Sequence, residues 1–348
     1  MNIKRIALTG TAVIAAAGLL SACSSSSGSS SSSADTAAAT TAAAAAPATS
    51  AAAAGDAAKY RIGVSLADQK SLFYIAEADG IKTACDAKGV ECVILSADND
   101  AQRQVQQVND LLAQDIDALI FTAQDATAAS AGVKAAHDAG VPVLAVDQKP
   151  QDDNAKLLAT YIATDSVKAA DALCTWVFAQ MGGKGEIGIL HGVKGSTAEV
   201  ERTQGCQDAL AKNPDIKVDA EDVANWDETE AYNAATNMLQ ANPNITAIFG
   251  ESDAMGIGAA KAARDQNREI ISVGIDGFPT MVTAIKDGLT QATQAQIPFG
   301  MGQMAVDNAI TLLGGGTIPA LQLQDTVLVT TDNVNDVNPV DFYGPNVK

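Results

Sequence analysis

The chain has 348 residues, a formal net charge of −19 and 47% hydrophobic residues. Its acidic balance argues against a nucleic-acid partner, because a phosphate-binding surface needs a basic patch, and it offers no electrostatic attraction to anionic lipid. The length exceeds that of a usual single core, so we expect two domains.

The first 22 residues have the pattern of a secretory signal. A basic start precedes an apolar stretch over 6–20 that is too short to cross a bilayer comfortably. The ending Leu-Ser-Ala-Cys is similar to the bacterial lipobox, in which the cysteine is diacylated and becomes the new N-terminus. We therefore expect residues 1–22 to be a lipoprotein signal peptide and Cys23 to be the membrane anchor, with a soluble export signal as the alternative.

The next segment, residues 23–58, consists almost entirely of Ser, Ala, Thr and Gly. Such a composition cannot bury enough apolar surface to offset the entropy lost on ordering. The sequence therefore predicts a flexible tether, and folded structure is expected from about residue 60.

From residue 60 onward, short apolar runs alternate with helical patterns, which indicates βαβ units and a doubly wound α/β fold with parallel sheets. Strands are predicted at 60–66, 91–95, 118–121, 143–146, 159–163, 186–190, 217–223, 247–249, 271–275, 290–295 and near 327–330. Helices are predicted at 72–88, 101–114, 128–139, 167–181, 197–212, 228–240, 254–265, 280–287 and 302–313. A second copy of the pattern begins near 159, so we expect two lobes with a ligand cleft between them.

Four cysteines remain in the exported chain besides Cys23, and an even number in an oxidising compartment favours disulfides. Cys85 is expected near a helix end and Cys92 at the start of the next strand. Cys174 and Cys206 fall on consecutive predicted helices. Three pairings are possible, and this placement favours Cys85 with Cys92 and Cys174 with Cys206, while buried free thiols are the alternative.

Polar side chains follow most of the predicted strands, at the edge where doubly wound sheets bind ligands. They include carboxylates, amides, an arginine and aromatic rings, among them Ser71, Phe73, Tyr74, Asp147, Gln148, Arg202, Trp226, Ser252, Asp276 and Gln296. This set suits a neutral polyhydroxylated ligand, because each hydroxyl both donates and accepts while the C–H faces of a sugar lie against aromatic rings.

Several of these residues also have purely structural interpretations. Phe73 and Tyr74 could be core residues at a helix start. Arg202 could form only a surface ion pair among neighbouring glutamates. Asp253 is expected to cap a helix rather than to bind ligand, and Asp165 can likewise cap the helix that follows it.

Enzyme signatures are not found in the sequence. The chain has two histidines, His137 and His191, and no Cys-x-x-Cys pair, so a metal site is not expected. Gly256-Ile-Gly258 lacks the third glycine of a dinucleotide-binding loop. We expect no catalytic residues, no cofactor and no metal; a triad that uses one of the histidines is the alternative.

Several short segments, in one order and at fitting spacing, resemble the periplasmic sugar-binding proteins of ABC importers of the ribose and galactose type. The resemblance covers about 60–330 and is carried by Ser71-Leu-Phe-Tyr74, Val143-Leu-Ala-Val-Asp147, Gly195-Ser-Thr-Ala-Glu-Val-Glu-Arg202, Ile248-Phe-Gly-Glu-Ser-Asp253, Val273-Gly-Ile-Asp-Gly277 and Ala292-Thr-Gln-Ala-Gln296. It implies the type I periplasmic binding protein fold, in which two Rossmann-like lobes are joined by a hinge.

The resemblance also implies roles for individual residues. The rings of Phe73, Tyr74 and Trp226 would enclose the ligand, and Asp147 and Asp276 would accept hydrogen bonds from its hydroxyls. Arg202 and Gln296 fall on the family's arginine and late glutamine. The chain departs from the ribose pattern at Ser71, Gln148 and Ser252, so another pentose, a hexose, a sugar alcohol or a cyclitol is at least as good a candidate as ribose.

The sequence thus predicts a monomeric, lipid-anchored solute-binding protein on the outer face of the cell membrane, or in the periplasm. It would capture a sugar, polyol or cyclitol and deliver it to an ABC permease. The expected lobes are 60–164 with 297–325 and 165–296 with 326–348, with crossovers near Thr164, Gln296 and Asp325. A ligand-sensing receptor that signals to a partner is the alternative, whereas a repressor is excluded because an export signal stands where its DNA-binding domain would be.

Overall fold

The computed structural model describes residues 60–125 and 129–347, and it contains two six-stranded sheets with helices between the strands. The predicted doubly wound α/β architecture is therefore confirmed. The expected signal peptide, Cys23 and the tether lie outside the described residues. Among the helices of the described ranges, none is long and apolar enough to cross a membrane.

The first sheet has the strand order β11-β5-β4-β3-β1-β2, and all of its pairings are parallel. Its strands are β1 (Arg61–Leu66), β2 (Glu91–Ser96), β3 (Ala118–Phe121), β4 (Val143–Val146), β5 (Thr160–Thr164) and β11 (Leu321–Gln324). Every residue of β3 and β4 is buried, because helices cover both faces of a parallel sheet and its central strands are consequently apolar throughout.

The second sheet has the order β12-β10-β9-β8-β6-β7. Its strands are β6 (Gly185–His191), β7 (Ile216–Val223), β8 (Ile245–Gly250), β9 (Ile271–Asp276), β10 (Ala292–Ala295) and β12 (Val327–Thr330), of which β12 pairs antiparallel with β10. The edge strand β7 alternates polar and apolar residues and is largely exposed, as expected of an edge.

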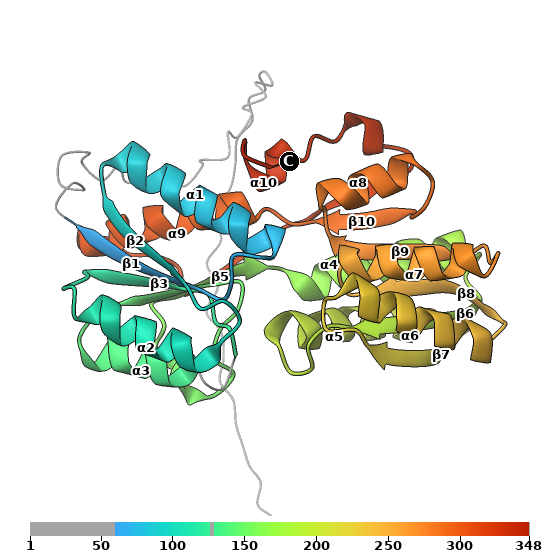
Figure 1. The fold of residues 1–348 in the computed structure, drawn as a ribbon, viewed down its shortest axis with the longest axis horizontal. Helices are drawn as coiled ribbons and strands as arrows, with labels where there is room; N and C mark the ends of the chain where they lie inside the picture. Colours follow the sequence, from blue (N-terminus) through green and yellow to red (C-terminus); the bar gives the residue numbers. More distant parts are fainter. Residues whose placement is uncertain (1–59, 126–128, 348) are drawn as a thin grey trace, which may run out of the picture. The chain divides into compact units, whose positions relative to one another are not determined.

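The helices occupy both faces of each sheet (Figure 1). They are α1 (Leu72–Lys88), α2 (Ala101–Leu112), α3 (Ala129–Asp138), α4 (Ser166–Gln180), α5 (Thr197–Lys212), α6 (Glu228–Ala241), α7 (Asp253–Asp265), α8 (Pro279–Lys286), α9 (Pro298–Leu313) and α10 (Val340–Tyr343), with short 3₁₀ turns η2 (Asp153–Leu157) and η3 (Val334–Asp336). Helix α1 packs on α9 and α2 on α3, whereas α4 packs on α5 and α6 on α7.

Two glycines allow α1 and α9 to approach each other closely. A Cβ atom on Gly80 would lie 2.0 Å from the carbonyl oxygen of Phe299, and one on Gly302 would lie 2.3 Å from the carbonyl oxygen of Glu77. Because backbone atoms cannot give way as a flexible side chain can, any larger residue at either position would push the helices apart. This contact joins a helix late in the chain to the first sheet.

The chain passes between the two sheets after β5, after β10 and again between β11 and β12. Both β1 and β6 lie at the point where the strand order reverses, beside β3 and β8 respectively. In such sheets the crevice beyond the carboxyl ends of these strands is the preferred ligand site. The topology therefore predicts a ligand site at the loops that follow β1, β3, β6 and β8.

The C-terminal segment packs against elements of both halves of the chain. Phe342 and Tyr343 are buried in a cluster with Ala76 of α1 and Ile257 of α7. The hydroxyl group of Tyr343 donates a 2.8 Å hydrogen bond to the carbonyl oxygen of Asp276, the last residue of β9. Helix α10 is thus hydrogen-bonded directly to the end of β9.

Two disulfides join Cys85 to Cys92 and Cys174 to Cys206, which is the pairing expected from the sequence. The first connects the end of α1 to β2 across the left-handed Gly89, and the second connects α4 to α5.

Three local expectations need correction. Strand β11 was not predicted, because its Leu-Gln-Leu-Gln sequence is short and half exposed and becomes a strand only by pairing with β5. Helix α9 begins at Pro298 rather than at 302, since proline is suited to the first helical turn. Ser252 caps α7, not Asp253: its hydroxyl accepts from the Met255 amide. Asp165 caps α4 as expected.

Helix α1 buries one carboxyl group, that of Glu77, which is 0% exposed. Its Oε1 accepts a 2.5 Å hydrogen bond from Thr122, and its Oε2 has no partner among the described residues. Burial raises the pKa of Glu77 to about 8, against the opposing effect of the Thr122 bond and with a smaller contribution from the charge of Asp147. Glu77 is therefore mostly protonated at neutral pH.

This buried carboxyl group predicts a pH dependence of stability. Between its ordinary pKa and about 8 the folded state binds a proton that the unfolded state has lost, so the free energy of unfolding falls as pH rises. We expect Glu77→Gln to reduce this loss by about 1 kcal/mol or more between pH 5 and 8. Urea denaturation at both pH values measures the free energy of unfolding. Glu269→Gln, at an exposed position, is the control and should keep the wild-type pH dependence. Equal pH dependence in wild type and Glu77→Gln would contradict the assignment.

Candidate functional site

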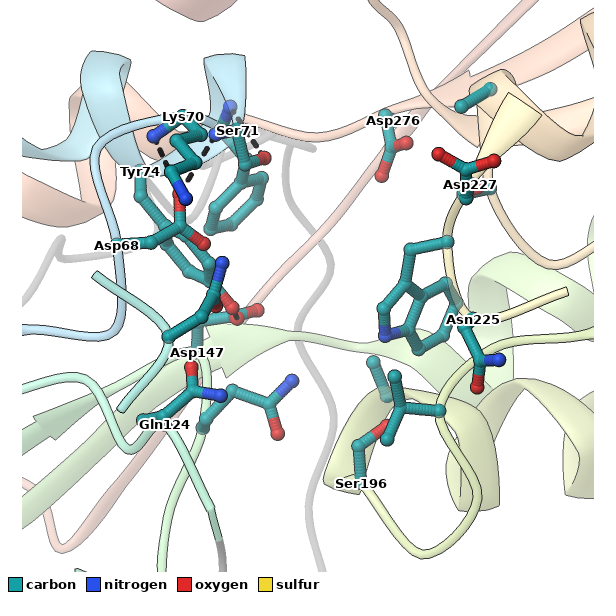
Figure 2. A pocket seen from close by; sticks show the side chains of 18 of the residues that line it. Asp68, Lys70, Ser71, Tyr74, Gln124, Asp147, Ser196, Asn225, Asp227 and Asp276 are labelled. Atoms are coloured by element: carbon teal, nitrogen blue, oxygen red, sulfur yellow. Dashed lines mark hydrogen bonds between the residues drawn. The ribbon is translucent and has the colours of Figure 1, made fainter. Parts of the chain in front are cut away.

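A cavity of about 890 Å³ lies between the carboxyl ends of the two sheets. Side chains from both halves of the chain face it: Asp68, Tyr74, Gln124 and Asp147 lie on one side in Figure 2, and Ser196, Asn225, Asp227 and Asp276 on the other. The cavity is therefore built from loops that follow several different strands.

The loop between β1 and α1 forms one wall, and it is organised by Asp68. The carboxylate of Asp68 accepts hydrogen bonds from the backbone amides of Lys70 and Ser71 at 2.6 and 2.8 Å. Ser71 then caps α1 by accepting from the Phe73 amide. Helix α1 consequently starts at the cavity and presents the aromatic residues of its first turn to it.

The two aromatic residues of that turn have different roles in the geometry. The rings of Phe73 and Tyr74 meet edge to face, with centroids 5.4 Å apart and planes at 86°. Only one of two perpendicular rings can stack face to face on a flat ligand. The Tyr74 hydroxyl donates a 3.2 Å hydrogen bond to Oδ2 of Asp147, so this residue also orients a carboxylate.

Asp147 follows β4 in a left-handed conformation, with φ of 58°. Its amide donates to the Ile162 carbonyl at 2.8 Å, and its own carbonyl accepts from the Tyr161 hydroxyl at 2.6 Å. Burial raises the pKa of Asp147 to about 6, while the charge of Arg202 and the Tyr74 hydrogen bond lower it. A non-glycine residue held in this backbone region next to a cavity is typical of functional sites.

Gln148, the next residue, contacts the opposite wall. Its Oε1 accepts a 3.1 Å hydrogen bond from the backbone amide of Thr197, at the start of α5. A second amide, Nε2 of Gln151, donates to the carbonyl oxygen of Gly195 at 2.9 Å. Polar side chains of the first half thus bridge to the loop after β6.

Trp226 forms the facing wall and is itself in a left-handed conformation, with φ of 65°, as is Asn225 before it. Its indole ring lies against Gly192, where a Cβ atom would come within 2.0 Å of the ring. The Arg202 guanidinium lies 5.5 Å from the ring centroid, within range of a cation–π interaction. The absence of a side chain at Gly192 therefore allows this ring position.

Arg202 is buried, not on the surface, so the interpretation as a surface ion pair is wrong. Its Nη1 donates to the carbonyl oxygen of Glu251 at 2.5 Å and lies 3.7 Å from Oδ1 of Asp276. The helix carrying it, α5, is acidic at neighbouring positions, which suggested exposure. The helix is instead oriented so that Arg202 reaches the carboxyl end of the second sheet and is buried there.

Asp276 ends β9 and is buried beside a second carboxylate, Asp253. Its Oδ1 accepts from Nε2 of Gln296 at 2.7 Å, and its Oδ2 accepts from the Asp253 amide at 3.2 Å. Burial raises the pKa of Asp276 to about 6, and the charge of Arg202 opposes this increase. Asp253 accepts from the amides of Gly277 and Phe278, so it holds the backbone on which Asp276 stands.

Gln296 connects the two halves through its side-chain amide. Its Oε1 accepts a 2.6 Å hydrogen bond from the hydroxyl of Thr164, at the end of β5, while its Nε2 donates to Asp276. It is buried at the crossover that follows β10. One side chain therefore links the strand ends of both sheets.

All of the ligand-contact residues predicted from the sequence line this cavity, namely Ser71, Phe73, Tyr74, Asp147, Gln148, Arg202, Trp226, Ser252, Asp276 and Gln296. Lys70, Gln124 and Phe278 also line it and were not predicted. Gln124 follows β3, so the same strand-end rule would have found it. The Ser252 hydroxyl already accepts from the Met255 amide, which leaves its hydrogen for a further acceptor.

A second group of titratable residues lies behind the Trp226 wall and was not predicted. His191, Glu199 and Glu251 are buried, and their potential ligand atoms lie within 4.8 Å of one another, close enough to surround a metal ion. Lys194 already contacts Oε1 of Glu199 at 2.8 Å, so a cation is provided by the chain itself. The cavity and this cluster share the loop after β6.

The cavity is lined by carboxylates that accept hydrogen bonds, a guanidinium that donates them and amides that both donate and accept. Aromatic rings lie on its facing walls. Such a set can satisfy several hydroxyl groups at once and can contact an apolar ring face. None of the side chains lining it from the described residues is a cysteine or a histidine.

Comparison with known proteins agrees with this geometry. Residues 62–317 match the family model described as periplasmic binding protein domain. The ribose import binding protein of Bacillus subtilis is 30% identical over 75% of this chain and 84% of its own length, and the xylitol-binding protein of Mycolicibacterium smegmatis is 33% identical over 79% and 78%.

Solved structures give the same result. A solute-binding protein from Actinobacillus succinogenes with bound D-allose has a TM-score of 0.76 and 27% identity, and the match covers 80% of this chain and all of that one. One from Bacillus halodurans with bound myo-inositol has a TM-score of 0.75 and 25% identity, over 81% and 98%. With the sheet order, the cavity and the match over 62–317 all in agreement, the chain belongs to the periplasmic binding protein family.

Proposed function

We propose that this protein is the substrate-binding component of an ABC importer and that it captures a sugar, a sugar alcohol or a cyclitol in the cavity between its two sheets. The observation that carries the proposal is a pair of carboxylates, half-buried Asp147 and buried Asp276, one from each sheet, with Arg202 near the second. The relatives named for ribose import and xylitol binding support import over signalling and favour binding over catalysis.

The ligand class follows from the donors and acceptors. A neutral polyol can donate to both carboxylates and accept from Arg202 with the same kind of group, which an ion of either sign cannot do. Trp226 and the edge-to-face pair of Phe73 and Tyr74 line the same cavity. The apolar C–H face of a sugar or cyclitol ring packs well against such aromatic rings. The residues Gln148 and Ser71 differ from those of the ribose binders at the corresponding positions, so the ligand need not be ribose.

Binding would favour the arrangement in which both halves contact the ligand. A ligand shifts a conformational equilibrium only by its difference in affinity for the two states, and a ligand that spans the cavity can donate to Asp147 and Asp276 at the same time. We take the lobes to be 60–164 with 297–325 and 165–296 with 326–348. Pairing of β11 with β5 and of β12 with β10 supports this division.

The remaining parts of the proposal rest on the sequence. A lipobox-like ending at Cys23 supports export and lipid anchoring to the outer face of the cell membrane, with residues 23–58 as the tether. The partners would be the small ligand and a membrane permease, and the protein would act as a monomer without cofactor or metal.

A ligand screen tests the function. Pentoses, hexoses, sugar alcohols and cyclitols are added separately, and the melting temperature is measured. A ligand at 100 times its Kd stabilises the folded state by about 2.7 kcal/mol, which is readily detected. We expect at least one polyol to do so. Stabilisation by amino acids or peptides only, with no response to any polyol, would contradict the proposal.

Removal of either carboxylate tests the site. We expect Asp147→Ala and Asp276→Ala each to weaken binding by about 1.5 to 3 kcal/mol, the range for hydrogen bonds to charged groups. Isothermal calorimetry with the ligand from the screen measures this. Asp110→Ala, an exposed aspartate on α2, removes the same charge away from the cavity and should leave the affinity unchanged. Wild-type affinity in both cavity variants would rule out the site.

The raised pKa values of Asp147 and Asp276, both about 6, predict the pH dependence of binding. The ionised carboxylates are the acceptors, so protonation competes with the ligand and affinity falls as pH drops through 6. Affinity should be at least several-fold weaker at pH 5 than at pH 6.5. Calorimetry in buffers of different ionisation enthalpy would also show proton release on binding below pH 6. Affinity that improves as pH falls from 6.5 to 5 would contradict the prediction.

A further inference from the structure

The loop that connects β6 to α5 forms part of the cavity wall and is held at both ends by buried glutamates. The amide of Gly192 donates to Oε2 of Glu251 at 2.8 Å, and the amide of Gly195 donates to Oε2 of Glu199 at 3.0 Å. Glu251 is 0% exposed and Glu199 only 5%. The position of this loop therefore depends on two carboxylates that have been taken out of water.

The same two anchors determine where two cavity side chains lie. Gly192 lies directly against the Trp226 ring, so the bond to Glu251 fixes the surface on which the indole rests. Arg202 donates to the backbone carbonyl of Glu251 and lies near the same ring. A shift of Glu251 would thus move both an aromatic wall and the guanidinium.

Buried carboxylates need a nearby positive charge, because a charge removed from water without a partner is strongly unfavourable. Lys194 provides it for Glu199 at 2.8 Å. For Glu251 the nearest such group is His191, whose Nδ1 lies 3.0 Å from Oε1. Thr203 adds a neutral hydrogen bond of 2.7 Å to the same oxygen.

The geometry of His191 distinguishes its protonation states. Its Nδ1 faces Oε1 of Glu251, with the Thr203 hydroxyl at 3.2 Å and Oε1 of Glu199 at 3.8 Å, and its Nε2 lies 3.3 Å from Oε2 of Glu221 on β7. A neutral imidazole has one N–H and can donate to only one of these carboxylates, whereas the imidazolium donates to both. With a carboxylate oxygen at each ring nitrogen, the site fits the charged form.

We infer that protonated His191 is a positioning residue for the proposed ligand site: as counter-ion to Glu251 it holds the Gly192–Gly195 loop, Trp226 and Arg202 in their binding arrangement. The inference rests on the proposed function and adds to it a dependence on pH. According to this inference, the cluster of His191, Glu199 and Glu251 binds a proton on His191 and no metal ion.

The direction of the pH effect follows from the surroundings of His191. Burial lowers its pKa, but the hydrogen bonds to Glu251 and Glu221 and the charge of Glu251 outweigh burial and the opposing charge of Lys194, so the pKa is raised above its ordinary value. The network is therefore complete below that ordinary value and is lost as pH rises through the raised one. Weakening on the alkaline side is opposite in sign to the effect of Asp147 and Asp276.

Tryptophan fluorescence tests the inference without any ligand. The chain has two tryptophans, Trp176 and Trp226, and Trp176→Phe leaves a single reporter beside Gly192 and Arg202. Emission of the full chain is recorded from pH 6.5 to 9.5 in this background. We expect one transition, which His191→Gln abolishes and which Glu221→Gln moves toward acid, because one partner of the imidazolium is removed.

Matched variants separate this effect from other titrations. His137→Gln removes the chain's other histidine, which is exposed, and should leave the transition unchanged. Glu77→Gln removes the buried carboxyl group whose pKa of about 8 falls in the same range, and it too should leave the transition in place. A transition that persists in His191→Gln, that is missing in the parent, or that Glu77→Gln removes would overturn the inference.

Two further measurements complete the test. Ligand affinity of the parent should fall several-fold across the transition, whereas that of His191→Gln should be constant over the same pH range. Addition of EDTA should change neither curve, and a transition that EDTA shifts would overturn the assignment in favour of a metal site. If no polyol binds, the proposed function fails while the fluorescence titration still decides whether His191 positions the loop.

Discussion

Buried carboxylates at the ends of parallel strands are the constraint on which the rest of the structure depends. Asp276 and Glu251 are buried and Asp147 is half-buried, and a carboxylate in such a place needs hydrogen-bond donors or a nearby cation. Arg202 lies among them, close to Asp276 and bonded to the Glu251 backbone. The donors that satisfy these groups are also the groups that shape the cavity.

The hydrogen bonds that join the two halves at the cavity are made by neutral side chains. Gln148, Gln151 and Gln296 make the bridging contacts, and all of them are neutral amides. A hydrogen bond of this kind contributes about 1 kcal/mol net, because water can replace either partner. Opening and closing would therefore exchange these amide hydrogen bonds for bonds to water or ligand, while the apolar cluster that contains Ala76 and Ile257 also joins the two halves.

Much of the fold and of the site could be predicted from the sequence, because both follow from local patterns. Buried strands such as β3 and β4 are continuous apolar runs, and polar residues directly after them must lie at one edge of a sheet. Ser71, Asp147 and Asp276 were found in this way. Their chain positions alone place them beyond the carboxyl ends of strands.

Other features could not be predicted, since they depend on contacts between distant segments. Strand β11 exists only because β5 offers an edge to pair with. The burial of Arg202 depends on the direction in which α5 leaves the β6 loop, and the role of His191 depends on glutamates 30 and 60 residues away. No local pattern distinguishes such a histidine from a solvated one.

The C-terminal turn has a practical consequence for anyone who alters the end of this chain. Tyr343 bonds to the backbone of Asp276, and Gly344 follows in a left-handed conformation against the ring of Phe299. Affinity tags, fluorophores or surface linkers attached here would begin within a few residues of a group that supports the cavity. Immobilisation and labelling chemistry should therefore use exposed side chains such as Lys82 or Lys134, whose ammonium groups make surface ion pairs with Asp86 and Asp138.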